Sequence, residues 1–369
     1  MTKKIFALTM PKWGMTMTEG TVADWLAEEG DEVNVGSDLV EIETEKISAA
    51  IEAPEQGVLK RILVKKGSVV KVASLIAVIS EPSVNETDID EFIATFKLPD
   101  QEEISKTSEV DNNQFLDVDL HRIRVRTLGS GLDVLLIHGI GGDIGSWLFN
   151  QDFLANEFRV HAIDLPAHGE STLSLSEGSI AELGETVAKC MNQLSSNPFH
   201  LVGHSLGGSV VMEIANKFSD LVTSLSLVNP VGFTEEINRE FLEIFLSASK
   251  RKEMKEALTK LFYLTENVSR TMVENSLRHN RLEGVISQLN LIVEKNFPNY
   301  IQAIDWRPLL QSFSIPVQII WGSHDQIIPF DTKGFPENVM LKEIEKAGHM
   351  VQMEQPTKFN LLLKEYFKS

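Results

Sequence analysis

Glu41-Ile42-Glu43-Thr44-Glu45-Lys46-Ile47 lies at the centre of an internal repeat. When the segment from residue 20 to residue 42 is shifted by 37 positions, its glycines and apolar residues fall on residues of the same kind. Self-similarity at a fixed period indicates two copies of one supersecondary unit. The matching pairs are Gly20 with Gly57, Val22 with Leu59, Leu26 with Leu63, Gly30 with Gly67, Val33 with Val70, Val35 with Val72, Leu39 with Ile76, and Ile42 with Ile79.

Each copy alternates apolar and polar residues at period two, which is typical of half-buried strands. Gly30 and Gly67 interrupt this alternation and predict a turn in each copy. We expect the two copies to pack face to face as a small sandwich over residues 1–80, with residues 43–46 as an exposed turn between strands. Lys46 would then be held out into solvent.

A single exposed lysine is most often an ordinary surface residue, but Lys46 lies at the pseudo-symmetric centre, between Glu45 and Ile47. The stretch Glu43 to Ile47 resembles the lipoylation motif of lipoyl domains, and the resemblance covers the whole first module. It implies an all-β flattened barrel of the lipoyl/biotinyl type, with a lipoyl group bound covalently to Lys46 as cofactor. The related biotinyl domain carries its lysine between two methionines, which Glu45 and Ile47 do not match.

Composition limits the function classes. The 369 residues suit two or three domains, and with 43% hydrophobic residues the chain can bury an ordinary core. The formal net charge of −19 argues against a nucleic-acid or anionic-membrane partner. The single Cys190 cannot form an internal disulfide. We find no signal peptide and no run of eighteen apolar residues, so the sequence predicts a cytoplasmic protein without a membrane partner.

Residues 81–113 are predicted to be an acidic flexible linker. The stretch from Glu81 to Asp111 contains ten acidic residues and two lysines, with one brief apolar cluster at residues 89–96 that allows a short helix. A flexible chain of this length spans roughly 30 Å on average, so the first module could swing.

Residues 114–369 alternate short apolar runs with helical stretches, which predicts a doubly wound, mostly parallel sheet. Between residues 233 and 300 the strand-like runs stop, and three segments are predicted to be helices: 241–246, 254–264 and 285–293. An all-helical insertion between strands would cover the carboxyl edge of the sheet as a lid. The strand-like runs are 134–138, 160–164, 199–203, 225–229 and 317–321.

Gly203-His204-Ser205-Leu206-Gly207 matches G-x-S-x-G directly after one of these strands and before a predicted helix. That context is the one a nucleophile elbow requires, because the glycines allow a tight turn that exposes the serine. Residues 115–369 thereby resemble the α/β-hydrolase fold. The pattern also includes the stretch from Asp164 to Ser171, after another strand.

A serine nucleophile needs a base and an acid that orients the base. His349 and Asp325 follow Ser205 in the chain order expected of this fold, and Asp325 follows the last strongly apolar strand. His324 and Asp331 are possible alternatives. Three further histidines belong to the fold motifs, and we expect them to be structural: His138, His168 and His204.

The oxyanion hole needs two donors, which we expect to be the backbone amides of Leu206 and of Ile140 in the glycine-rich turn 138–142. No nucleotide-binding glycine motif opens a helix, and no H-E-x-x-H or C-x-x-C spacing is present, so we predict no metal.

Taken together, the two modules resemble the dihydrolipoyl acetyltransferase components of acetoin dehydrogenase complexes. This resemblance implies transfer of an acetyl group from the arm on Lys46 to coenzyme A in acetoin catabolism. It also implies a thiamine-diphosphate-dependent acetoin dehydrogenase component, a dihydrolipoyl dehydrogenase and a lipoate-attaching enzyme as partners.

The chain departs from the acyltransferases of 2-oxo-acid dehydrogenases, because it lacks their H-x-x-x-D-G motif and a basic subunit-binding module. Two rival functions stay open: a lipoyl-linked thioesterase or esterase that releases acetate, and a lipoyl carrier with an inactive docking domain. For the coenzyme A phosphates, Lys250-Arg251-Lys252 is a weak candidate site.

Overall fold

The computed structural model of the protein describes residues 4–11, 17–44, 48–96, 112–329, 334–337 and 339–368. Contacts within the chain divide it into two compact units, an N-terminal one made mainly of residues 1–111 and a C-terminal one made mainly of residues 112–369, with Ser269–Met272 grouped with the first. The two units have separate hydrophobic cores and are described separately below.

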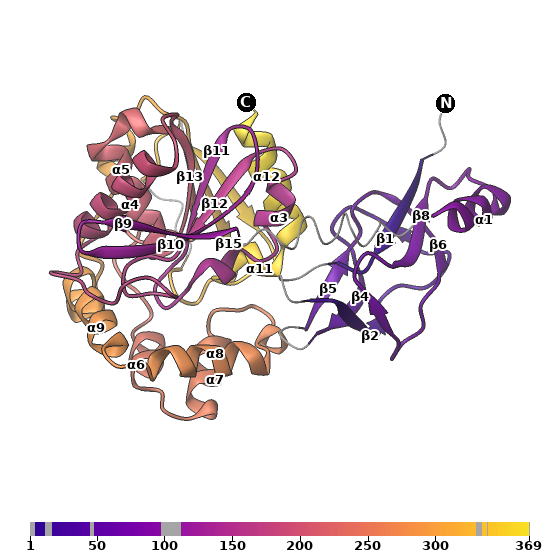
Figure 1. Ribbon diagram of the computed structural model, residues 1–369, viewed down its shortest axis with the longest axis horizontal. Helices are drawn as coiled ribbons and strands as arrows, with labels where there is room; N and C mark the ends of the chain where they lie inside the picture. The colour runs from indigo at the N-terminus through magenta and orange to yellow at the C-terminus, as the bar shows by residue number, and fades with distance from the viewer. Residues whose placement is uncertain are drawn as a thin grey trace. The chain divides into compact units, whose positions relative to one another are not determined.

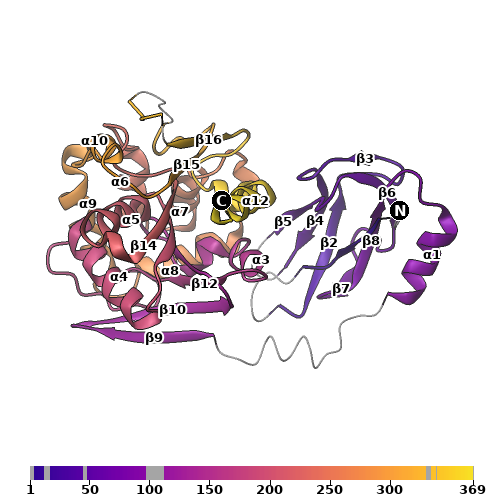
Figure 2. The same ribbon diagram turned by 90° about the horizontal axis from the view of Figure 1, so that it is seen from above.

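The described part of the N-terminal unit forms two four-stranded sheets, drawn in indigo and purple in Figures 1 and 2. One sheet has the order β1-β8-β6-β3 and the other has the order β5-β4-β2-β7. The strands are β1 (Ile5–Thr9), β2 (Glu19–Trp25), β3 (Glu32–Val33), β4 (Asp38–Glu43), β5 (Ser48–Glu52), β6 (Gly57–Ile62), β7 (Val69–Lys71) and β8 (Leu75–Ser80).

The two copies of the repeat exchange strands, which the sequence did not predict. β2 of the first copy pairs with β4 of its own copy and with β7 of the second, while β6 of the second copy pairs with β8 of its own copy and with β3 of the first. The turns lie at Gly30 and Gly67, whose φ values of 102° and 81° are in the region that favours glycine. The exchange gives each sheet one more paired strand and a shared core that includes Val22, Leu39 and Ile79.

A short helix lies within the range predicted as linker. α1 (Glu86–Thr95) begins at an Asn85 side chain that accepts a hydrogen bond from the amide of Asp88. Its Ile89 is fully buried against Val78 of β8. The acidic residues up to the end of α1 therefore belong to the packed N-terminal unit.

The C-terminal unit is built on an eight-stranded sheet with the order β16-β15-β14-β13-β11-β12-β10-β9. The six neighbouring strands β16, β15, β14, β13, β11 and β12 all pair in parallel. The β9–β10 hairpin adds two antiparallel strands at the β12 edge of the sheet, as Figure 2 shows. The strands are β9 (Asn113–Val118), β10 (His121–Gly129), β11 (Asp133–Ile137), β12 (Arg159–Ile163), β13 (Phe199–His204), β14 (Val222–Val228), β15 (Val317–Gly322) and β16 (Met340–Ile344).

Helices cover both faces of this sheet. α5 (Leu206–Lys217) packs on β13 and β14 and against α4 (Ile180–Leu194), whereas α3 (Gln151–Leu154) packs on β10 and β12 and against α12 (Pro356–Phe367). The core between the sheet and α12 includes Trp147, Phe158 and Phe359. Within the described residues, no helix is both long and apolar enough to cross a membrane.

The insertion between β14 and β15 contains five α-helices in the described chain: α6 (Arg239–Ser247), α7 (Arg251–Thr259), α8 (Arg270–Asn280), α9 (Val285–Asn296) and the short α10 (Arg307–Leu310). The first four are shown in orange in Figure 1. α7 ends before the predicted boundary at residue 264, and the sequence reasoning did not identify α8. A Cβ on Gly141, after β11, would lie 2.3 Å from the ring of Phe245 on α6. This contact places α6 of the insertion against the turn that follows β11, and a lid function of the insertion stays a prediction.

Candidate active site

Ser205 lies in the sharp turn between β13 and α5, with φ 54° and ψ −115°. A positive φ is uncommon outside glycine, and such backbone strain is concentrated at functional sites. A Cβ on Gly203 would lie 2.2 Å from the carbonyl oxygen of Gly207, and a Cβ on Gly207 would lie 2.4 Å from the carbonyl oxygen of Ile137. Close backbone approach therefore requires both glycines of G-x-S-x-G.

The Nδ1 atom of His349 donates a hydrogen bond of 2.8 Å to Oδ2 of Asp325. The same carboxylate accepts a 2.6 Å hydrogen bond from Nδ2 of Asn229 on Oδ2, and two backbone hydrogen bonds on Oδ1, from Ile327 at 2.8 Å and Ile328 at 3.1 Å. Since Nδ1 carries the donated proton, Nε2 of His349 is left as the basic nitrogen. Asp325 and His349 thus form an oriented acid–base pair.

His204, the residue before Ser205, joins the elbow to the loop that carries His349. Nε2 of His204 donates a 2.8 Å hydrogen bond to the backbone oxygen of His349, and the two rings lie 4.7 Å apart. Ser205 and His349 are each 3% exposed, and Asp325 is 7% exposed. The structure therefore gathers the three predicted residues at the carboxyl edge of the sheet.

The two predicted oxyanion donors belong to segments that lie next to Ser205. A Cβ on Gly139 would lie 3.3 Å from Oγ of Ser205, so the turn that carries Ile140 passes directly beside the nucleophile. Leu206 is the first residue of α5, and its amide has no intrahelical acceptor. For the Ile140 amide we find no acceptor within the described residues. Both amides are thus left without a backbone acceptor among the described residues, and their role as oxyanion donors stays a prediction.

The other motif histidines have structural partners. His138 donates through Nδ1 to the carbonyl of Gly139 at 2.7 Å and accepts through Nε2 from the amide of Leu165 at 3.0 Å, and burial lowers its pKa to about 4. Burial also lowers the pKa values of His168 and His204. Burial therefore favours the neutral form of all three histidines. His138 joins the turns after β11 and β12, whereas His168 donates through Nδ1 to the carbonyl of Pro166 within its own turn.

His324 and Asp331 are the alternative candidates for the acid–base pair. Nδ1 of His324 lies 2.7 Å from Oγ of Ser323, and its ring packs 4.3 Å from the ring of Tyr263. It is therefore Nδ1 of His349, and not His324, that is hydrogen-bonded to Asp325. Asp331 lies outside the described residues.

Sequence reasoning missed three polar residues around the site, of which Asn229 and Asp164 are fully buried and Glu354 is partly buried. Asn229 directly follows β14 and holds Asp325; a polar residue at the carboxyl end of a buried strand was the available signal. Burial raises the pKa of Asp164 to about 7, and its carboxyl oxygens accept hydrogen bonds from the amides of Ile144 and Glu170. Burial likewise raises the pKa of Glu354 to about 7.

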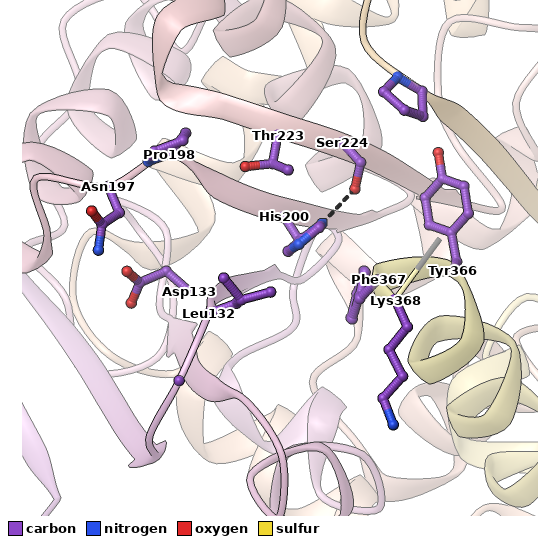
Figure 3. Close-up of a pocket in the computed structure, with 12 residues that line it drawn as sticks. Leu132, Asp133, Asn197, Pro198, His200, Thr223, Ser224, Tyr366, Phe367 and Lys368 are labelled. Atoms are coloured by element: carbon purple, nitrogen blue, oxygen red, sulfur yellow. Dashed lines mark hydrogen bonds between the residues drawn. The ribbon is translucent and has the colours of Figure 1, made fainter.

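A cavity of about 450 Å³ lies at the opposite edge of the sheet, beside the first residues of β11, β13 and β14 (Figure 3). Its floor includes His200, whose Nδ1 lies 2.7 Å from Oγ of Ser224. The cavity contains none of the three predicted catalytic residues, so it does not carry the predicted chemistry. It is lined by Gly131, Leu132, Asp133, Asn197, Pro198, His200, Thr223, Ser224, Pro316, Tyr366, Phe367 and Lys368.

Lys46 itself lies outside the described residues, but the strands on either side of it are described. β4 and β5 pair antiparallel, with Glu43 opposite Ser48 at the end of the ladder. The segment that carries Lys46 therefore connects two paired strands at one end of a sheet. A primary amine in this connection fits the amide attachment of a lipoyl group.

Two further site predictions concern charged groups. Arg251 of the candidate phosphate site forms a 2.8 Å ion pair with Glu274, so part of its charge is already neutralised. No group of three potential metal ligands gathers in the parts of the chain that the structure describes.

Comparison with known proteins identifies both units. A family described as "alpha/beta hydrolase fold" matches residues 134–356, and a family described as "Biotin-requiring enzyme" matches residues 7–79. The solved meta-cleavage product hydrolase of Pseudomonas fluorescens IP01 is similar to the C-terminal unit, with a TM-score of 0.63 and 19% identity over 69% of this chain and 97% of that one. This likeness confirms the predicted fold.

Two curated relatives match nearly the whole chain, and both are named dihydrolipoyllysine-residue acetyltransferase component of acetoin cleaving system. The protein from Cupriavidus necator is 38% identical over 98% of this chain and 97% of its own length. The protein from Pseudomonas putida is 39% identical over 97% of both chains. The chain thus belongs to the family of dihydrolipoyllysine-residue acetyltransferase components in which a lipoyl domain is joined to an α/β-hydrolase-fold domain.

Proposed function

We propose that the protein transfers an acetyl group from a dihydrolipoyl arm on Lys46 to coenzyme A, through Ser205, His349 and Asp325, in the breakdown of acetoin. The observation that carries this proposal is the hydrogen-bonded His349–Asp325 pair beside a strained serine elbow. It occurs in the same chain as a lipoyl-type unit. The names of the full-length relatives supply the connection with acetoin.

In the first half-reaction, Nε2 of His349 removes the proton from Oγ of Ser205 as Oγ attacks the carbonyl carbon of the acyl donor. The lipoyl group, when bound, supplies that donor as a thioester on a mobile arm. The Asp325 carboxylate stabilises the imidazolium and holds it in orientation. The amides of Ile140 and Leu206 stabilise the negative charge on the former carbonyl oxygen.

Collapse of this tetrahedral state breaks the carbon–sulfur bond and leaves the acyl group on Ser205. His349 returns its proton to the departing sulfur. In the second half-reaction, Nε2 of His349 takes the proton of the coenzyme A thiol, and the thiolate attacks the acyl-serine ester. The proton then returns to Oγ of Ser205, so the enzyme is regenerated.

Transfer to a thiol requires that water be a poor competitor. Ser205 and His349 are almost fully buried, and α6 of the lid packs against the turn that carries Ile140. A covered site can favour a bound thiol over water. This arrangement supports a transferase over an open esterase site.

The proposal includes three protein partners. A thiamine-diphosphate-dependent acetoin dehydrogenase component would load the arm, and a dihydrolipoyl dehydrogenase would reoxidise it. A lipoate-attaching enzyme would modify Lys46. The relatives are named as components of an acetoin cleaving system, which supports the existence of such partners.

The test uses the lipoylated full-length chain, reduced and supplied with an acetyl thioester donor. Acetyl-coenzyme A formation and intact mass are measured for the wild type and for Ser205→Ala and Lys46→Arg. We expect Ser205→Ala to lose transfer by at least about 10³-fold and to lose the acetyl adduct on the second unit. Lys46→Arg should lack the lipoyl mass and should transfer nothing from its own arm.

Two results would contradict the proposal. Transfer by Ser205→Ala at the wild-type rate would exclude the serine mechanism. Consumption of the donor at the same rate without coenzyme A, with release of acetate, would instead identify a lipoyl-linked thioesterase.

A further inference from the structure

The lid turn, residues 261–264 directly after α7, lies against the histidine loop, residues 347–350. The amide of Met350 donates a 3.1 Å hydrogen bond to the carbonyl of Leu261. A Cβ on Gly348 would lie 2.8 Å from the amide nitrogen of Tyr263 and 2.9 Å from the oxygen of Leu261. The two backbones therefore approach too closely for a side chain at position 348.

One carboxylate joins these two segments. Glu354, the last residue of α11 (Val351–Glu354), accepts a 2.6 Å hydrogen bond from the amide of Gly348 on Oε2. Its Oε1 accepts hydrogen bonds from the amides of Tyr263 at 2.7 Å and Leu264 at 3.4 Å. The carboxylate thus holds the lid turn with one oxygen and the histidine loop with the other.

No helix-end effect explains this position, because a carboxylate at the C-terminal end of a helix faces the negative end of the helix dipole. Burial, together with the nearby Asp325 carboxylate, raises the pKa of Glu354, and the three backbone amides oppose this rise. The hydrogen bonds to the amides are therefore what favours a charged group in this position.

The lid turn also contacts the loop of the catalytic acid. The ring of Tyr263 packs 4.3 Å from the ring of His324, which directly precedes Asp325. The amide of His324 in turn donates to the carbonyl of Ala347 at 2.9 Å. The segments that carry the base and the acid are thus bound to each other and to the same lid turn.

We propose that Glu354 is a positioning residue, which fastens the lid turn to the histidine loop and so sets the orientation of His349 toward Ser205. This inference rests on the proposed serine triad. A docked lid turn gives a correctly placed base, and release of the lid turn misplaces the base without changing any residue that touches the substrate.

The test compares Glu354→Gln with Glu253→Gln in the full-length chain. Glu354→Gln keeps the shape of the side chain, but its amide nitrogen cannot accept a hydrogen bond from a backbone amide. Glu253 is a matched control: it accepts hydrogen bonds from the amides of Ser249 at 2.9 Å and Lys250 at 3.1 Å, within the lid alone. Both variants remove a carboxylate that caps lid amides, and only one removes the link to the histidine loop.

Three quantities are measured below the unfolding midpoint of each variant: the rate at which a fluorophosphonate labels Ser205, amide hydrogen exchange, and the downfield proton resonance of Nδ1–H of His349. For Glu354→Gln we expect labelling to fall by about 10- to 100-fold, because small misplacements of reacting groups cost this much. Exchange should rise at both 261–264 and 347–350, and the resonance should shift or broaden. Glu253→Gln should label within about twofold of the wild type and retain the resonance.

Gly348→Ala provides a second variant if Glu354→Gln does not fold, because it separates the same two segments and leaves Glu354 intact. We expect it to slow labelling in the same way. Wild-type labelling and an unchanged resonance in a folded Glu354→Gln protein would overturn the inference, even if its stability fell. That result would leave the serine mechanism standing, whereas transfer by Ser205→Ala would refute the mechanism itself.

Discussion

The carboxylate of Asp325 has more hydrogen-bond partners than the sequence pattern indicated. It receives hydrogen bonds from His349, Asn229 and the amides of Ile327 and Ile328. Four donors leave it little freedom, which is what orientation of a catalytic histidine requires. The chain order of motifs predicted the acid, but only the structure shows how it is held.

Asp325→Asn should lower fluorophosphonate labelling of Ser205 by about 10²–10⁴-fold, because the amide favours the wrong tautomer of His349. Circular dichroism and the unfolding midpoint should show that the variant is folded. Labelling at the wild-type rate would mean that another group orients the histidine.

Asp164 predicts a pH dependence of stability. Burial, and secondarily the charge of Asp143, raises the pKa of the Asp164 carboxyl to about 7, above its ordinary value of 3.8. The folded state therefore binds this proton more tightly than the unfolded state does. The resulting stabilisation is fully present below the unfolded pKa and is lost as the pH rises through about 7.

Asp164→Asn cannot titrate, so the difference in unfolding free energy between wild type and variant should shrink by about 1–3 kcal/mol from pH 5 to pH 8. Urea titrations at several pH values measure this difference. A gap that stays constant or widens with rising pH would contradict the raised pKa.

At the level of elements, the lid packs against the glycine-rich turn 138–142, which carries the predicted oxyanion donor Ile140. Gly141 has a φ of 69°, and a Cβ there would lie 2.3 Å from the ring of Phe245 on α6. The sequence predicted both the glycine turn and the lid helix. Their contact joins residues about a hundred positions apart, and neither pattern contains it.

Gly141→Ala should force Phe245 or the turn to move, and so displace the adjacent amide of Ile140. We expect the rate of Ser205 labelling to fall by about 10-fold or more. Complete loss of one oxyanion donor lowers the rate of an enzyme by about 10²–10³-fold, and a displaced donor loses part of that contribution. Gly284→Ala is the control: it also has a positive φ, of 90°, but a Cβ there meets no atom within 4 Å. Equal effects of the two substitutions would show that backbone strain, and not the contact with the lid, is responsible.

At the scale of the whole molecule, the two units have separate cores. Leu39 is fully buried in the core of the N-terminal unit, and Leu136 is fully buried in the core of the C-terminal unit. Because these two cores have no member in common among the described residues, each unit should unfold as its own cooperative transition.

Leu39→Ala should lower the midpoint of one calorimetric transition at a cost of about 2–5 kcal/mol, and should leave the other transition unchanged. Leu136→Ala should have the reverse effect. A single transition that both substitutions shift equally would show that the two units unfold together.

The sequence by itself determined the local chemistry of this protein. The repeat predicted two β copies around Lys46, because strand periodicity is written in neighbouring residues, and the elbow and the chain order pointed to Ser205, Asp325 and His349. Only the tertiary structure decided the strand exchange of β3 and β7, the packing of α1, and the contacts of Asn229 and Glu354. These features depend on contacts between segments that are far apart in the chain. The order of residues along the chain does not state which distant segments pair or how they are aligned.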